Sequence, residues 1–259
     1  MRDKNDTTII IPTFNRPDFC RRAVESAMAQ TQPCRVLVAN DGDPLPHEVY
    51  EGACYYQTGR ADHWYLTVYD AAHRANTPYV TVLCDDDWLE PTFLERCFEL
   101  MAPDVAFVFT ESTVHHRDGT TELHWGSSMR GDGLIRSEII GDRLLRERRI
   151  VTPSCCLYRR EDVLRCLMPG GVPGFRNAMK GCANPSGPDH ALALFALLYR
   201  PSVGYISDPL VNLDAGEQST TMIELGRDSG CDLHENYDNA RLAYHAIREA
   251  HRQIGGGRP

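Results

Sequence analysis

The alternation of short apolar runs with helix-like segments is the sequence feature that most constrains the fold. Runs typical of buried strands cover residues 7–12, 35–39, 54–57, 79–84 and 105–109, and helix-like segments cover 16–29, 62–74 and 91–101. Strands that alternate with helices favour a parallel sheet with right-handed crossovers. We therefore expect an α/β fold, with a Rossmann-like, mostly parallel sheet that is flanked by helices.

Polar residues follow three of these runs at the point where each strand should end. They are Thr13, Asp41 and the three acids 85–87. In open parallel sheets, ligands bind beyond the carboxyl ends of the strands. We expect these three strand ends to converge on one ligand-binding crevice.

The acids Asp85, Asp86 and Asp87 are adjacent, so their carboxylates repel one another. A divalent cation offsets that repulsion, and Mg²⁺ or Mn²⁺ prefers oxygen ligands of this kind. A solvated acidic turn in front of the helix near Pro91 is the competing interpretation, and the cluster alone does not decide between them.

The second half of the chain is less regular. It predicts a hairpin at 114–125, a helix at 137–148, a strand at 155–158, a helix at 161–167, a Gly- and Pro-rich loop at 169–188, an apolar helix at 189–199 and an amphipathic helix at 234–254. We divide the chain into residues 1–110 and 111–215, which form the two halves of one domain, and a C-terminal loop and helix at 216–259.

Composition and charge restrict the classes of function. The 259 residues are 42% hydrophobic and 24% charged, as in an ordinary globular protein, and the net charge is −9. That charge disfavours nucleic acid as a partner, and a polyphosphate ligand would need a cation or a local group of arginines. With no apolar run long enough for a membrane span and no secretory signal, we expect a cytoplasmic protein with reduced cysteines.

Three segments carry a resemblance to a known family. TIIIPTFNRP, VLVANDGDP and YVTVLCDDDWLEP resemble, in this order, the nucleotide-binding half of family 2 glycosyltransferases. The resemblance covers residues 7–110 and continues more weakly to about residue 215. It implies a GT-A fold with an acceptor-binding C-terminal half. It also implies a metal-dependent, inverting transfer of a sugar from a nucleoside diphosphate, most often UDP, to an acceptor hydroxyl.

The resemblance assigns the donor-binding residues. Pro12 and Thr13 would lie under the nucleobase, and Asp41 would accept a hydrogen bond from the imide N–H of the base. Asp41 also suits an Asx turn before Gly42, and it could fill both roles. Arg60 is the candidate for the diphosphate contact, although an arginine at a helix start is more commonly solvated.

The resemblance also assigns the metal site. Asp85 would contact the ribose, Asp86 would be the principal ligand of Mn²⁺ or Mg²⁺, and Asp87 would support the site. Many relatives have a further Asp where this chain has Cys84, which leaves the ribose and metal assignments open by one residue. His234 is a possible third metal ligand.

A general base is still required, because the acceptor hydroxyl must lose its proton as it attacks. In family 2 enzymes an Asp at the start of an apolar helix has this role, and Asp189 matches that arrangement. An Asp that is simply favoured by the helix dipole is the alternative. Trp88 and Trp125 are candidates for stacking on a sugar, although aromatics beside strand ends usually belong to the core.

Other classes of function are less well supported. The motifs G-x-S-x-G and G-x-x-x-x-G-K-[ST] are absent, which disfavours a nucleophile-elbow hydrolase and a P-loop kinase. A sugar nucleotidyltransferase would be expected to carry a glycine-rich loop after the first strand, where this chain has PTFNRP. A non-catalytic nucleotide-binding protein with this fold also remains open, and the acceptor is not predicted.

Overall fold

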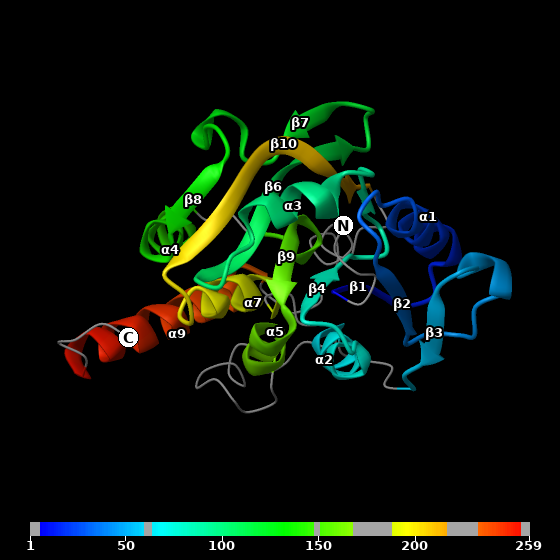
Figure 1. Ribbon diagram of the computed structural model, residues 1–259, viewed down its shortest axis with the longest axis horizontal. Coiled ribbons are helices and arrows are strands. Elements are labelled where there is room, and N and C mark those ends of the chain that lie inside the picture. Colours follow the sequence, from blue (N-terminus) through cyan, green and yellow to red (C-terminus); the bar gives the residue numbers. More distant parts are fainter. Residues whose placement is uncertain (1–5, 60–63, 148–150, 168–187, 217–232, 255–259) are drawn as a thin grey trace.

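A single ten-stranded sheet organises the structure, a computed structural model that describes residues 6–59, 64–147, 151–167, 188–216 and 233–254. The strand order is β3-β2-β1-β4-β9-β6-β10-β5, with β7 paired to β6 and β8 paired to β10. Helices cover the sheet, as Figure 1 shows. Within the described residues, no helix is both long and apolar enough to cross a membrane.

The N-terminal part of the sheet is parallel. Its strands are β1 (Thr7–Thr13), β2 (Arg35–Asn40), β3 (Cys54–Gln57) and β4 (Tyr79–Val82), and its helices are α1 (Pro17–Met28), α2 (Trp64–Arg74) and α3 (Phe93–Leu100), with a short 3-10 helix, η1 (His47–Val49). Strand β1 pairs with β2 on one side and with β4 on the other, both in parallel. The predicted alternation of strands and helices is confirmed here.

The C-terminal part of the sheet is mixed. The long strands β6 (Val105–His116) and β10 (Ser202–Ala215) pair in parallel, and β9 (Cys156–Arg159) lies antiparallel between β4 and β6. Strand β6 was predicted to end at Phe109. It continues to His116 because β10 supplies partners along its length.

Shorter elements complete the fold. They are β5 (Trp88–Leu89), β7 (Thr121–Leu123), β8 (Gly133–Arg136), α4 (Ser137–Arg146), α5 (Arg160–Leu167), α7 (Pro188–Ala196), α9 (Leu233–Ile254), and the 3-10 helices η2 (Gly126–Ser128) and η3 (Pro153–Cys155). The predicted hairpin between residues 114 and 125 is present as the antiparallel pair of β6 and β7. The predicted loop at 169–188 lies almost wholly outside the described residues.

Alternate residues of β1 point into two separate cores. Ile9 and Ile11 pack with α1 and α3, whereas Ile10 packs on the other face of the sheet with α2, α5 and α7. Successive side chains of a strand point to opposite faces, so a strand covered on both faces needs a continuous apolar run. The run TTIIIP was predicted to be such a strand, and each of these isoleucines is 0% exposed.

A buried carboxylate fixes the turn that follows β7. Glu111, in β6, is 1% exposed. Its Oε1 accepts hydrogen bonds from the backbone N–H groups of Ser112 (2.8 Å) and Trp125 (2.9 Å), and its Oε2 accepts one from Gly126 N–H (2.9 Å). These donors supply hydrogen bonds to a carboxyl group that is removed from water.

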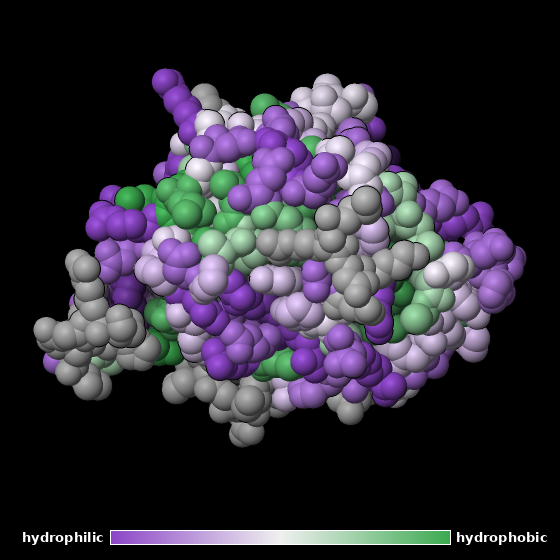
Figure 2. All heavy atoms as spheres, in the orientation of Figure 1, coloured by the Kyte–Doolittle hydropathy of each residue, from purple (hydrophilic) through white to green (hydrophobic). Residues whose placement is uncertain are grey.

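Most of the surface in view in Figure 2 is polar, with apolar areas between the polar ones. One apolar area lies where Figure 1 draws β8 and α4. Leu134 of β8 is 52% exposed and Ile139 of α4 is 47% exposed. Neither side chain lies at the strand ends that form the candidate site.

Candidate functional site

The three polar strand ends meet at one edge of the sheet. Thr13 ends β1, Asp41 follows β2, and Asp85 follows β4 after two residues. The Thr13 hydroxyl donates a hydrogen bond to Asp85 Oδ2 at 2.8 Å, and the backbone N–H of Asp41 donates to the Thr13 carbonyl at 2.9 Å. The structure thus brings these predicted residues together, because β1 lies between the other two strands.

The three acids that follow β4 are nearly removed from water. Asp85, Asp86 and Asp87 are 2%, 9% and 6% exposed. Burial raises the pKa of Asp85 to about 6, although the nearby Arg16 opposes that rise. Burial, with the charge of Asp86 beside it, raises the pKa of Asp87 well above its usual value. The interpretation as a solvated acidic turn is therefore wrong for this structure.

Residues far apart in the sequence position Asp87. The hydroxyl of Ser154, in η3, donates to Asp87 Oδ2 at 2.6 Å, and the backbone N–H of Asp214, near the end of β10, donates to Asp87 Oδ1 at 3.2 Å. The Ser154 hydroxyl oxygen also accepts from Cys84 N–H at 3.1 Å. Sequence analysis missed Ser154 and Asp214, since nothing in their own segments indicates contact with the acids.

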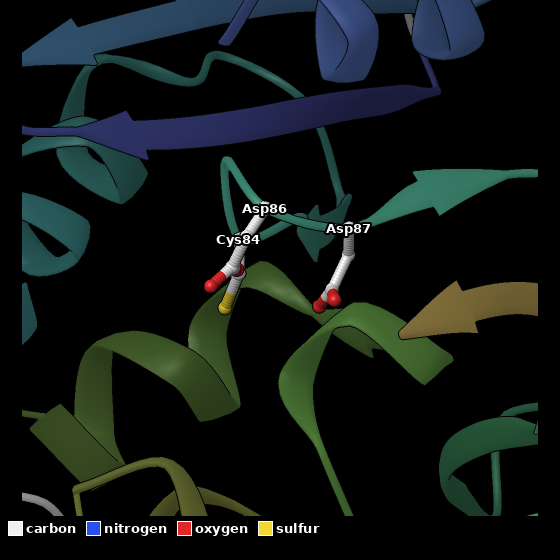
Figure 3. Close-up of side chains that lie close together, drawn as sticks. All are labelled: Cys84, Asp86 and Asp87. Atoms are coloured by element: carbon white, nitrogen blue, oxygen red, sulfur yellow. The ribbon is translucent and has the colours of Figure 1, made fainter. Parts of the chain in front are cut away.

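The cluster fits a divalent cation. Cys84, Asp86 and Asp87 each offer a ligand atom, and these three atoms lie within 4.8 Å of one another. Figure 3 shows the side chains of Cys84 and Asp86 pointing the same way from their turn, with that of Asp87 beside them. Two carboxylates suit Mg²⁺ or Mn²⁺, while a thiol is a softer donor. The softer donor, the thiol of Cys84, nevertheless lies inside the candidate metal site.

Two arginines, one at the N-cap of α1 and one within it, reach the acids, and sequence analysis did not predict this. Arg16 Nη2 lies 2.7 Å from Asp85 Oδ1, and Arg16 Nη1 lies 3.1 Å from Asp86 Oδ2. Arg22 Nη2 donates to the Asp86 carbonyl and lies 3.0 Å from Asp214 Oδ2. Arg16 was expected only at the start of the helix, where the structure indeed places it as the N-cap before Pro17.

Asp41 is 9% exposed, and two hydroxyls hold its carboxylate. Thr58 donates to Oδ1, and Thr67, in α2, donates to Oδ2 at 3.0 Å. Pro12, the other predicted base-binding residue, is buried within β1. Phe14, which follows Thr13, is 51% exposed, so a large aromatic ring stands beside the site. Sequence analysis did not single it out.

Two predicted site residues lie outside what the structure describes. Arg60, the candidate diphosphate contact, precedes α2 and falls outside the described residues. The same holds for the side chain of His234, the possible third metal ligand. Both assignments therefore remain predictions.

Asp189 lies near the start of α7 and is partly exposed. Helix α7 contacts η3, which carries Ser154, whose hydroxyl donates to Asp87. The neighbouring His190 is 0% exposed, and burial lowers its pKa to about 3. His190 is therefore a neutral core residue.

Both candidate tryptophans pack against other side chains. Trp125 is 1% exposed and packs against Phe109, which confirms that it belongs to the core. Trp88 is partly buried, and the Arg22 guanidinium lies 4.1 Å from the centroid of its ring. The Trp88 ring therefore packs against one of the arginines at the acid cluster.

Comparisons with known proteins agree with this arrangement. A family model described as "Glycosyl transferase family 2" matches residues 8–167. No curated protein matches the chain. The matched segment includes every strand end that forms the site, and it is more than half of the chain.

Solved structures share the fold. S. aureus TarS 1-349 in complex with UDP-GlcNAc is 13% identical, with a TM-score of 0.62, over 97% of this chain and 76% of that one. The corresponding complex with UDP is 12% identical, with a TM-score of 0.59, over 97% and 74%. A longer S. aureus TarS is 13% identical, with a TM-score of 0.58, and this chain spans only 44% of it. The predicted GT-A fold is confirmed by these likenesses.

Proposed function

The chain belongs to glycosyl transferase family 2, and we propose that it transfers a sugar from a nucleoside diphosphate to an acceptor hydroxyl with the help of a divalent cation. The observation that carries this proposal is the buried acid cluster at the ends of β1, β2 and β4. UDP is the first choice of nucleoside diphosphate, since TarS, which shares the fold, is known in complexes with UDP and UDP-GlcNAc. Family membership favours transfer over the synthesis of a nucleotide sugar.

The nucleobase would bind between β1 and β2. Hydroxyls of Thr58 and Thr67 hold the Asp41 carboxylate in one orientation, and its remaining lone pairs can accept the imide N–H of uracil. Pro12 and Thr13 form the floor of this position in the proposal. The exposed ring of Phe14 is available to stack on the base.

The diphosphate would lie over the acids. In the proposal Asp85 binds the ribose, Asp86 is the principal metal ligand and Asp87 supports it, with Mn²⁺ or Mg²⁺ as the metal. A bound divalent cation would stabilise the negative charge that builds on the leaving diphosphate. Ser154 and the backbone of Asp214 hold Asp87 in place, which keeps the carboxylate ready without further rearrangement.

Asp189 is the proposed general base of a single inverting displacement. Its carboxylate takes the proton of the acceptor hydroxyl while the acceptor oxygen bonds to the anomeric carbon. The bond from that carbon to the diphosphate oxygen breaks at the same time, and the nucleoside diphosphate leaves. The contact of α7 with η3 supports this assignment, because η3 carries a residue that binds the acid cluster.

A donor-turnover assay tests the metal assignment. With several UDP-sugars and Mn²⁺, we expect turnover by the wild type and none by Asp86→Asn, while Asp18→Asn, at an exposed position of α1, serves as the control. Asp86→Asn removes one charge of the cluster and keeps the size of the side chain. Turnover that persists undiminished in excess EDTA after dialysis would contradict the proposed metal dependence.

A further inference from the structure

One guanidinium bridges the two carboxylates that the proposed function gives to the ribose and the metal. Separate nitrogens of Arg16 contact Asp85 and Asp86, at 2.7 Å and 3.1 Å. The Arg16 side chain is 22% exposed and the two carboxylates are 2% and 12% exposed, so the bridge is poorly solvated. Charges in such a place interact far more strongly than charges in water.

The backbone on either side of Arg16 is constrained. Asn15 has a φ of +55°, which is the left-handed region, and Pro17 begins α1. The Asn15 side-chain oxygen accepts a hydrogen bond from Asp43 N–H at 2.7 Å, which ties the loop after β1 to the loop after β2. Gly42 allows this close approach, because a Cβ there would lie 2.2 Å from Asn15 Oδ1. The guanidinium is therefore presented to the acids from a fixed anchor.

We propose that Arg16 makes binding of the divalent cation depend on the nucleotide. Without nucleotide, the guanidinium already offsets part of the negative charge of Asp85 and Asp86 and repels a second cation, so the cation binds weakly. A diphosphate brings negative charge that both cations can share, and the repulsion between them is relieved. This inference rests on the proposed function.

Arg22 does not have the same effect in this proposal. It contacts the Asp86 carbonyl and the carboxylate of Asp214, and its guanidinium lies against the Trp88 ring. The structure shows Arg16 on side-chain oxygens of Asp85 and Asp86, the two carboxylates that the proposed function gives to the ribose and the metal. Arg16 therefore competes directly for the ligand atoms.

The proposed coupling between Mn²⁺ and UDP binding predicts the direction in which each affinity changes when Arg16 is replaced. Removal of the Arg16 charge should strengthen binding of Mn²⁺ alone by about tenfold or more, as expected for one unit charge a few ångströms from the site. The factor by which UDP strengthens Mn²⁺ binding should then shrink. By linkage, the factor by which Mn²⁺ strengthens UDP binding shrinks equally.

Calorimetric titration with Mn²⁺, in the absence and presence of UDP, tests this in the wild type and in Arg16→Gln. Arg21→Gln is the matched control, since it removes the same charge from α1, and within the described residues the ion pair of Arg21 is with Asp18, at 3.9 Å. Arg16→Lys keeps the charge but loses the planar fork, so we expect Mn²⁺ alone to bind with an affinity between those of the wild type and Arg16→Gln.

Each outcome decides one of the two proposals. If the wild type fails to bind Mn²⁺ and UDP together, the proposed function fails. If the wild type binds both, but Mn²⁺ alone binds Arg16→Gln no more tightly than the wild type, only the role of Arg16 is refuted. Should Arg16→Gln not fold, the same comparison is made with Arg16→Met, which also removes the charge, and unchanged Mn²⁺ affinity there overturns the inference.

Discussion

Replacement of His190 should make the protein less sensitive to mild acid. His190 lies in α7 and is 0% exposed. Burial, the main cause, and the charge of Arg241 lower its pKa to about 3, from a usual value of 6.5, against the opposing effect of Asp238. The folded protein therefore keeps this imidazole neutral at pH values where the unfolded chain binds a proton.

The sign and size of the effect follow from proton linkage. As the pH falls below about 6.5, the unfolded state takes up a proton that the folded state does not, so the free energy of unfolding decreases until the pH reaches about 3. Between about pH 7.5 and pH 5, this one group removes about 2 kcal/mol of stability. Asp85 acts in the opposite direction in this range, because its pKa is raised to about 6 and its folded form binds the proton first.

The comparison of His190→Gln with the wild type separates the two contributions. Urea denaturation at about pH 7.5 and pH 5 gives the free energy of unfolding of each protein, and the loss between the two pH values should be about 2 kcal/mol smaller in the variant. His47→Gln, at an exposed position, controls for the removal of a histidine. Equal losses in the wild type and in His190→Gln would refute the argument, whatever the variant does to stability at pH 7.5.

Three further predictions each concern one residue. Gly42→Ala should destabilise the protein by about 1–3 kcal/mol in urea denaturation, because its Cβ would overlap Asn15 Oδ1, and a variant as stable as the wild type would contradict this close approach. Asp189→Asn should lower sugar transfer by about 10²–10⁴-fold with donor affinity kept within a few-fold, whereas retention of both would remove Asp189 from the mechanism. Glu111→Gln should destabilise the protein by about 1–3 kcal/mol, because the NH₂ group of the new side chain must face a backbone N–H donor. The exposed Glu122→Gln is the control and should change the melting temperature little.

The parallel part of the fold could be predicted because its information is local. Runs such as TTIIIP and RVLVA are typical of strands that are covered on both faces. The polar residues after them indicate which edge of the sheet binds a ligand. Thr13, Asp41 and the acids lie together because β1 pairs directly with both β2 and β4. The order of strands in a parallel sheet is enough to bring these residues together.

What could not be predicted depends on contacts between distant segments. Ser154 and Asp214 lie 67 and 127 positions from Asp87, and neither has a local pattern that indicates an acid as its partner. The sequence predicts only that Arg16 stands at a helix start. In the structure, the turn at Asn15 directs its side chain towards the acids. The extension of β6 to His116 likewise depends on β10, which is almost 100 residues away in the sequence.

The position of β9 has a consequence for the growing chain. Strands β4 and β6 are complete once the first 116 residues have been made, yet they are not neighbours, because β9 (Cys156–Arg159) must enter between them. Until then, β4 and β6 each present an unpaired edge made of residues that are buried in the finished fold. Such an edge can pair with other chains. Synthesis therefore passes through a stage in which aggregation competes with folding, and a fragment that ends before residue 156 would stay at that stage. A library of truncated or split versions of this protein should keep β4, β9 and β6 on one piece.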